Sequence, residues 1–351
     1  MLDRVHLIAP AGVSRPFFTK LDCDTPEAFV AMVQRAIGPA FPVTADVELL
    51  AAREDESRGG RTDDARRAAD IQTALANDEV VALLTIRGGA WLTRILPRID
   101  FSVLDARSRR VAVWGFSELT TLVNIVGHHP NGLGVYDMGP AFLVYGLRHY
   151  AQMCRLEGTP LADNDSAWVR DHLRPELDAF HQNLGVMLHG TGEVVEVSAR
   201  IERGNLPNRT DNASFVGGNL TLLSTLVGTP FEPAIDPNGK WLLLEDYNDK
   251  PERLDRFLSH LSLAGYFERC VGVLLGNFHF GERDLLPTIL AILDYHLPAG
   301  RSLPVLSTRQ IGHTWPMTPL PLHTPAEVVV TGEDDVRFVF PPHVFAIIDA
   351  V

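Results

Sequence analysis

One stretch, residues 110–126 (RVAVWGFSELTTLVNIV), restricts the fold of this chain more than any other. Residues 111–114 form a continuous apolar run, as expected of a strand that is covered on both faces. Apolar residues recur at helical spacing after Ser117, so the chain changes from strand to helix within a few residues. A short buried strand followed at once by a helix is typical of a parallel sheet flanked by helices. We therefore expect an α/β fold with Ser117 at the tip of a sharp turn.

The turn at Ser117 has half of the signature of a nucleophile elbow. Such a turn exposes a serine hydroxyl and directs the following backbone N–H groups towards an oxyanion. Gly115 is the small residue needed two places before the serine, whereas Leu119 occupies the place where a second glycine is usual. Ser117 could equally be an ordinary helix N-cap. The motif alone leaves a catalytic and a structural interpretation open.

Composition narrows the classes of partner. The 351 residues are 46% hydrophobic and 21% charged, which is typical of a globular protein long enough for two domains. The formal net charge of −13 disfavours nucleic-acid and anionic-membrane surfaces and favours a small-molecule or peptide partner. Cys23, Cys154 and Cys270 lack the spacing of a disulfide framework or a zinc site, so we expect no metal or cofactor. With no signal-peptide or membrane-span pattern, the sequence predicts a cytoplasmic protein.

Strand and helix patterns alternate before the elbow. The predicted strands cover residues 5–9 and 79–86, and the predicted helices cover 25–37 and 59–78. The second strand ends in Gly88 and Gly89 before a helix-like run at 91–96, an arrangement that lets backbone N–H groups approach an anion. Gly89 could thus form part of an oxyanion hole or bind a substrate carboxylate. An ordinary glycine turn is the alternative.

The second half of the chain contains an acid and a histidine in places suited to a site. The apolar strand WLLLED (241–246) ends with Glu245 near the edge where α/β folds bind ligands, and His313 lies in a loop rich in Gly and Pro. A salt bridge for Glu245 and a loop hydrogen bond for His313 are the ordinary alternatives. We expect a nucleophile domain over 1–143, a linker or insertion over 144–212, and a second domain over 213–351 with a closing β-hairpin.

These residues occur in the order serine, acid, histidine, one of the orders in which catalytic triads occur. A serine hydroxyl is a weak nucleophile near neutral pH and needs a base. His313 would take its proton, and Glu245 would orient the imidazole and stabilise its charged form.

Several ordered blocks resemble the LD-carboxypeptidase family of serine peptidases, and the resemblance runs through most of the chain. The blocks are HLIAPAG (6–12), RGGAWLTRILPRID (87–100), WGFSELTTL (114–122), GGNLTLLSTLVGTP (217–230), LLLEDYNDKPERLDRFLSHL (242–261) and GHTWPMTPLPL (312–322). The resemblance implies a nucleophile at Ser117, a triad acid at Glu245, a histidine at His313, and oxyanion-hole amides at Gly89 and Glu118. It also implies an α/β N-terminal domain, a smaller C-terminal α/β domain with a β-rich portion, a site between them, and a homodimer.

The chain departs from the family pattern beside the expected oxyanion hole. Ala90 and Trp91 follow Gly88 and Gly89 where the family often has Tyr-Gly, and Glu118 replaces an Asp. The length of the 144–212 segment looks closer to the microcin C immunity branch than to the murein-recycling members.

The activity implied is hydrolysis of an L,D peptide bond with release of a C-terminal D-amino acid from a murein tetrapeptide, as in peptidoglycan recycling. Two alternatives stay open. The first is an amidase acting on peptidyl-nucleotides or related amides, and the second is an inactive muropeptide-binding protein. A dinucleotide-binding dehydrogenase is disfavoured because neither Gly-Gly turn completes GxGxxG.

Overall fold

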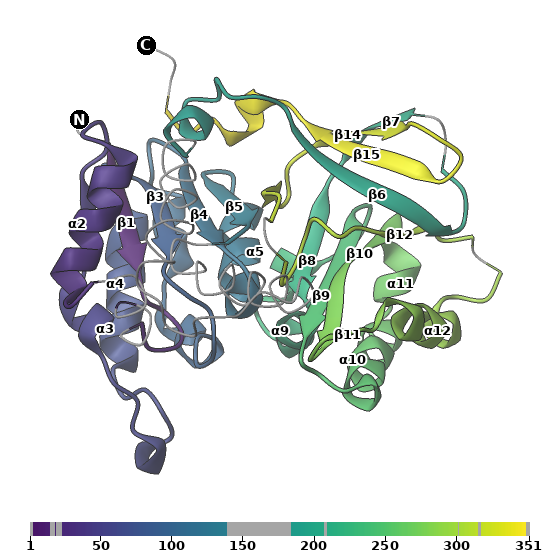
Figure 1. Ribbon diagram of the computed structural model, residues 1–351, viewed down its shortest axis with the longest axis horizontal. Helices are drawn as coiled ribbons and strands as arrows, with labels where there is room; N and C mark the ends of the chain where they lie inside the picture. Colours follow the sequence, from purple (N-terminus) through teal and green to yellow (C-terminus); the bar gives the residue numbers. More distant parts are fainter. Residues whose placement is uncertain are drawn as a thin grey trace, which may run out of the picture.

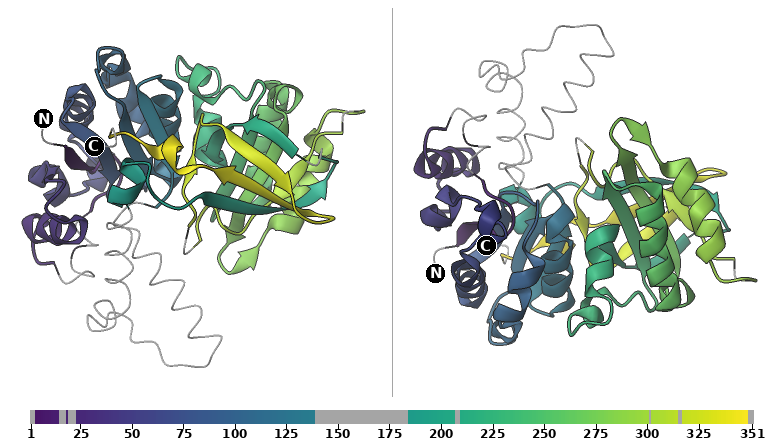
Figure 2. Two further views of the ribbon diagram at one scale, coloured as in Figure 1. Left: turned by 90° about the horizontal axis from the view of Figure 1, so that it is seen from above. Right: turned by 90° about the horizontal axis from the view of Figure 1, so that it is seen from below.

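The protein contains two β-sheets that lie side by side, each with helices packed against it (Figure 1). A computed structural model describes residues 3–14, 18, 23–138, 184–206, 209–300, 302–314 and 317–348. The two further views in Figure 2 show the same division into two blocks. Most of the predicted linker or insertion at 144–212 lies outside the described residues, and the domain boundaries stay a prediction.

The first sheet has six strands among the described residues, in the order β13-β5-β4-β3-β1-β2. The strands are β1 (Arg4–Ile8), β2 (Val43–Ala45), β3 (Val80–Thr85), β4 (Val111–Gly115), β5 (Gly132–Tyr136) and β13 (Leu320–Pro321). All neighbours pair in parallel except β13, which runs antiparallel to β5. Every residue of β3, β4 and β5 is buried, so the centre of this sheet is covered on both faces.

Helices of the first half connect these parallel strands. They are α2 (Pro26–Ile37), α3 (Val47–Ala51), α4 (Asp64–Ala76) and α5 (Thr120–His128), with short 3₁₀ turns η2 (Glu56–Arg58), η3 (Thr93–Arg98), η4 (Phe101–Leu104) and η5 (Ser117–Leu119). Helix α2 shows why such a segment is helical. Thr25 caps it by accepting a hydrogen bond from the N–H of Ala28, Pro26 occupies its first turn, and Gly38 ends it with φ of 84°.

The second sheet has nine strands among the described residues, eight of them in the order β7-β14-β15-β6-β12-β10-β9-β8, with β11 paired to β10. They are β6 (Val195–Arg203), β7 (Arg209–Ala213), β8 (Phe215–Asn219), β9 (Trp241–Tyr247), β10 (Gly272–Phe280), β11 (Arg283–Asp284), β12 (Val305–Ser307), β14 (Ala326–Val330) and β15 (Asp335–Phe340). Strands β8, β9, β10 and β12 are parallel, whereas β6, β15, β14 and β7 continue the sheet in antiparallel fashion. The remaining elements are α9 (Leu220–Leu226), α10 (Pro251–Leu263), α11 (Tyr266–Arg269), α12 (Leu286–His296), η8 (Glu232–Ile235) and η9 (Pro342–Phe345).

The predicted fold class is confirmed, including the parallel first sheet, the elbow turn and the β-rich part of the second sheet. The helix-like run expected at 91–96 differs in type, because it is the 3₁₀ turn η3. Trp91 just before it has φ of 73°, which is outside helical geometry, and Pro97 has no N–H to donate to an α-helical hydrogen bond. In the ranges that the structure describes, every helix is too short or too polar to cross a membrane.

The two sheets meet at α5 and β13. Helix α5 packs against β4 and β5 of its own sheet and against β8 and α9 of the second (Figure 1). Its Asn124 donates to the carbonyl of Gly217 at 2.8 Å and accepts from the N–H of the same glycine at 3.0 Å. Strand β13 follows the segment that carries His313 and pairs with β5. The carboxyl ends of β4, β5, β8 and β9 therefore lie close together.

Candidate active site

Ser117 lies at the tip of the strand-to-helix turn that the sequence predicts. It follows β4 after Phe116, opens η5, and has φ of 58°, a left-handed conformation that is rare for a residue with a side chain. A Cβ atom on Gly115 would lie 2.7 Å from Cβ of Leu119 and 2.8 Å from Oγ1 of Thr85, so this position has room only for glycine. The strained turn has the geometry of a nucleophile elbow.

The Gly88-Gly89 turn packs directly against the elbow. A Cβ atom on Gly88 would lie 3.4 Å from the backbone nitrogen of Glu118 and 3.4 Å from Cβ of Ser117. Gly89 has φ of 118°, a conformation that glycine adopts readily, and the carbonyl of Gly88 accepts a hydrogen bond from the N–H of Gly12 at 3.1 Å. The turn and the start of η5 thus bring several backbone amides close to Ser117.

Glu118 connects the elbow to the segment that follows Gly89. Its side chain is buried, and its carboxylate accepts a hydrogen bond from the N–H of Leu92 at 2.9 Å. Burial raises the pKa of Glu118 to about 7, although the backbone N–H groups of Leu92 and Thr93 and the positive charge of Arg67 act in the opposite direction. Glu118 therefore holds the loop after β3 with its side chain while its own amide lies at the elbow.

Two buried arginines of the α4 region fix the loop on the other side of the glycines. Arg61 donates to the carbonyls of Ala9 and Ala11, at 2.8 and 2.9 Å. Arg67 donates to the carbonyls of Pro10 and Trp91, and Asp63 pairs with both guanidinium groups. Their donors satisfy carbonyls that the tight loops leave without backbone partners.

Glu245, which is buried, and His313 form a hydrogen-bonded pair beside the elbow. The Nδ1 atom of His313 lies 2.8 Å from Oε2 of Glu245, whose side chain is 0% exposed. The other oxygen, Oε1, accepts from the hydroxyl of Tyr136 at 2.7 Å and from Nδ2 of Asn219 at 3.3 Å. The Tyr136 oxygen also accepts from the N–H of Ser117 at 3.3 Å. One hydrogen-bonded chain therefore joins the elbow of the first sheet to the acid of the second.

Aromatic rings and a glycine hold the imidazole in place. The His313 ring stacks on Tyr247 with centroids 4.9 Å apart and 16° between the planes, and the Phe116 ring meets it edge-on at 5.0 Å. Gly312 has φ of 105°, and a Cβ atom there would lie 2.9 Å from Oε2 of Glu245. Since the acid occupies that space, the histidine loop can approach it only with glycine at this position.

Asp246, the second acid at the end of β9, bonds to a partner other than His313. Its Oδ2 atom accepts from the N–H and the hydroxyl of Thr221 at 3.0 and 2.9 Å, at the start of α9. Burial raises its pKa to about 7, and the negative charges of Glu245 and Asp249 act in the same direction. The two acids point to different partners because successive side chains of a strand alternate.

The structure brings together the residues that the sequence singles out: Ser117, Glu118, Gly88, Gly89, Glu245 and His313. Sequence reasoning missed Tyr136 and Asn219, and a positional signal could have found both. Each ends a strand at the carboxyl edge of its sheet, where α/β folds place functional groups. No comparable signal identifies Arg61 and Arg67, because arginines at a helix start usually face solvent.

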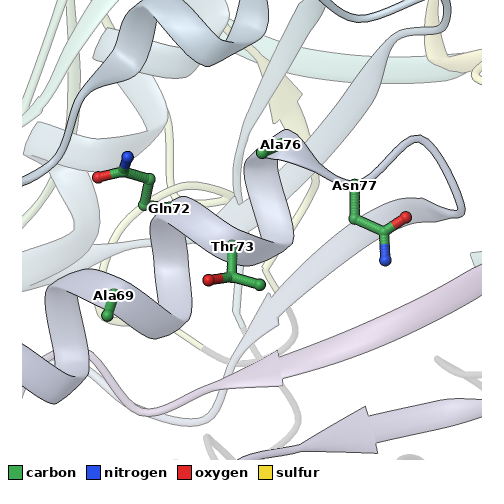
Figure 3. Close-up of a pocket in the computed structure, with 5 residues that line it drawn as sticks. All are labelled: Ala69, Gln72, Thr73, Ala76 and Asn77. Atoms are coloured by element: carbon green, nitrogen blue, oxygen red, sulfur yellow. The ribbon is translucent and has the colours of Figure 1, made fainter.

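Two hollows of the surface lie away from these residues. One, of about 470 Å³, follows the outer face of α4 and is lined by Ala69, Gln72, Thr73, Ala76 and Asn77 (Figure 3). It offers no charged side chain to a ligand. The other, of about 550 Å³, lies near the start of β14, where Arg110 and His323 are among its lining residues. Within the described part of the chain, no cluster of His, Cys, Asp and Glu is arranged to hold a metal ion.

Comparisons with known proteins agree with this geometry. Residues 5–136 match the model of the LD-carboxypeptidase N-terminal domain, and residues 212–328 match that of the C-terminal domain. A probable murein peptide carboxypeptidase of Bacillus subtilis (strain 168) is 30% identical over 324 residues, covering 91% of this chain and 86% of the relative. The microcin C7 self-immunity protein MccF of Escherichia coli is 23% identical over 283 residues, covering 78% of this chain and 77% of MccF.

A solved structure shows the same fold over almost the whole length. The crystal structure of an MccF-like protein from Bacillus anthracis str. Ames superposes with a TM-score of 0.68 at 15% identity, covering 96% of each chain. The two domain models together account for most of this sequence, and the family resemblance predicted from the sequence blocks is confirmed. On these grounds the chain belongs to the LD-carboxypeptidase family.

Proposed function

We propose that the protein is a serine hydrolase that cleaves an L,D peptide bond and releases a C-terminal D-amino acid from a murein tetrapeptide-like substrate. Ser117 Oγ attacks the carbonyl carbon while His313 takes the hydroxyl proton, and Glu245 stabilises the imidazolium. The oxyanion accepts hydrogen bonds from the N–H groups of Gly89 and Glu118, a kind of contact worth about 3–4 kcal/mol per donor.

Breakdown of this intermediate follows the same proton path in reverse. His313 gives its proton to the nitrogen of the departing D-amino acid, the C–N bond breaks, and an ester remains on Ser117. A water molecule then loses a proton to His313 and attacks the ester carbonyl. The C–O bond to Ser117 breaks, the serine regains its proton, and the shortened peptide leaves with a new carboxylate.

The observation that carries this proposal is the Glu245–His313 pair, with 2.8 Å between Oε2 and Nδ1, which Tyr136 joins to a serine with φ of 58°. If Glu245 were only a salt-bridge residue and Ser117 only a helix N-cap, neither role would require this chain of hydrogen bonds. The substrate class is supported by the Bacillus subtilis relative, which is named a probable murein peptide carboxypeptidase and matches 91% of this chain.

The test is mass spectrometry of the products formed from murein tetrapeptide. The native protein is expected to release D-alanine, and Ser117→Ala is expected to lower the rate by at least about 10³-fold. Ser108→Ala, at an exposed serine, is the matched control and should keep the native rate. Release at the native rate by Ser117→Ala would show that another group is the nucleophile.

A second candidate activity is an amidase of the MccF type. It is supported by the likeness to MccF, which is 23% identical over 78% of this chain, and by Ala90 and Trp91, which stand beside Gly89 where the family often has Tyr-Gly. An aminoacyl sulfamoyl adenosine, hydrolysed by the native protein but not by Ser117→Ala, would support this candidate if murein tetrapeptide stayed intact. If neither substrate is hydrolysed and a serine-reactive phosphonate does not label Ser117, the third candidate remains, a muropeptide-binding protein without activity.

A further inference from the structure

We propose that Tyr136 is a positioning residue of this site, which ties the backbone of Ser117 to Glu245 and sets the basicity of His313. The inference rests on the proposed function, because it assigns Tyr136 to the same triad. Tyr136 ends β5 in the first sheet, whereas Glu245 lies on β9 in the second, so the contact also fixes the two halves of the site relative to each other.

Hydrogen-bond chemistry fixes the direction of both contacts. The backbone N–H of Ser117 can only donate, so the Tyr136 oxygen accepts in the 3.3 Å contact between them. The single phenolic proton is then available for Oε1 of Glu245, 2.7 Å away. Donation to a carboxylate is the stronger, charge-assisted kind of hydrogen bond. A phenylalanine at this position could make neither contact.

The surroundings leave the phenol no alternative position. The Tyr136 side chain is 0% exposed, and a Cβ atom on Gly218 would lie 2.6 Å from its Cε2 atom. Gly218 has φ of 137°, so this position both needs glycine and keeps the space that the ring fills. Burial and the negative charge of Glu245 raise the pKa of Tyr136 well above 10. The phenol therefore keeps its proton, and stays a donor, over the pH range in which the protein is folded.

The two carboxylate oxygens of Glu245 have different partners. Oε1 receives the donors of Tyr136 and Asn219, and Oε2 faces Nδ1 of His313. Each donor on Oε1 disperses negative charge that would otherwise stabilise the imidazolium. Without the phenol, Glu245 attracts the imidazolium more strongly. The pKa of His313 should then rise, and the neutral imidazole that acts as base should form at higher pH.

The titratable groups seen beside this pair have contacts of their own. Tyr247 of β9 stacks on the His313 ring. Asp246 neighbours Glu245 on the same strand, but it is bonded to Thr221, and Asp249 beyond it is paired with Arg253 at 2.8 Å. Glu118 at the elbow directs its carboxylate to Leu92. Since none of these partners changes when the phenol is removed, a shift of His313 reports on Tyr136.

The experiment is an NMR titration of the His313 ring in native protein and in Tyr136→Phe, with the signal assigned by its loss in His313→Gln. The midpoint of His313 is expected to rise by about 0.5–1 pH unit in Tyr136→Phe. The turnover of murein tetrapeptide should fall by about tenfold or more with KM little changed. Tyr266→Phe is the matched control, because Tyr266 is a buried tyrosine whose hydroxyl bonds Glu232 at 3.3 Å, away from the site.

A His313 midpoint in Tyr136→Phe equal to the native one would overturn the inference. If Tyr136→Phe does not fold, 3-fluorotyrosine placed at 136 keeps the ring and strengthens the donor, and the midpoint must then move to lower pH. The proposed function can fail separately. Native turnover in Ser117→Ala would refute the triad and this inference together. If Ser117→Ala is inactive but the His313 midpoint is unshifted in Tyr136→Phe, only the role of Tyr136 is refuted.

Discussion

Asp137, the residue after β5, shows how strongly burial alone can shift a carboxyl group in this protein. Burial raises its pKa to about 8, although the N–H of Met138 and the Trp114 side chain favour the ionised form. An aspartate of the unfolded chain loses its proton at about pH 4. Between these two values the folded protein holds one proton more than the unfolded chain. The contribution of Asp137 to the free energy of unfolding therefore falls as pH rises from about 4 to about 8.

We expect Asp137→Asn to remove this part of the pH dependence. One proton corresponds to about 1.4 kcal/mol per pH unit, so the native protein should lose about 4 kcal/mol more than the variant between pH 5 and pH 8. Urea unfolding at both pH values measures the difference. Asp24→Asn, at an exposed aspartate, controls for the loss of one charge. Parallel pH curves for native protein and Asp137→Asn would contradict the prediction.

At the same scale, the sequence pointed to Ser117, Gly89, Glu245 and His313 but not to Tyr136 and Asn219, which donate hydrogen bonds to Glu245. Ser117 and Gly89 have local signals, because a change of period and a glycine pair are visible within a few residues. Tyr136 contacts Glu245 across 109 residues of sequence, and nothing near either residue encodes that distance. Such contacts follow only once the order of strands in both sheets is known.

Helix α5 is the element on which the contact between the sheets depends. Seven of its residues, from Thr120 to Val126, are buried, and the buried residues include the polar Thr120, Thr121 and Asn124. These polar groups bond across the boundary: Asn124 bonds both backbone groups of Gly217, and the Thr120 hydroxyl accepts from the N–H of Asn219 at 2.9 Å. A helix that is buried nearly all round serves two sheets at once.

Asn124→Ala is expected to destabilise the protein by about 2–4 kcal/mol, because it leaves the buried N–H and C=O of Gly217 without partners. Chemical denaturation measures the loss. Thr73→Ala, at an exposed position of α4, provides a helix control that should change stability by less than about 0.5 kcal/mol. A cost for Asn124→Ala no larger than that of the control would mean that water replaces the lost side chain.

The pattern of apolar residues predicted most elements but missed those that are too short to show a pattern. Strands β3, β4 and β9 stand out as continuous apolar runs, and helix α2 is long enough to show a helical period. Strand β13 has two residues, Leu320 and Pro321, and it is a strand only because Leu320 pairs with Tyr136 of β5, far away in the sequence. A pairing between distant segments has no local signature, and so its contribution to the first sheet could not be foreseen.

For the whole molecule, these contacts imply that the two sheets stabilise each other. Apolar residues of both sheets belong to one continuous core. The backbone joins them as well, since the N–H of Leu322 donates to the carbonyl of Gly134 at 2.8 Å and that of His323 donates to the carbonyl of Phe215 at 2.8 Å. The segment carrying His313 is therefore held by β12 of the second sheet at one end and by β5 of the first at the other.

We accordingly expect the two sheets to unfold as one cooperative unit, unlike domains joined by a small polar interface. Native-state hydrogen exchange at increasing urea tests this, with β3 reporting on the first sheet and β9 on the second. The free energies of opening of both strands should converge on one value, and Asn124→Ala should lower both equally. Two separate values, with only one changed by Asn124→Ala, would mean that the halves open independently. The site would then come apart whenever one sheet unfolds alone, since Ser117 follows β4 of the first sheet and Glu245 lies on β9 of the second. Convergence would instead make the geometry of the site a property of the whole fold.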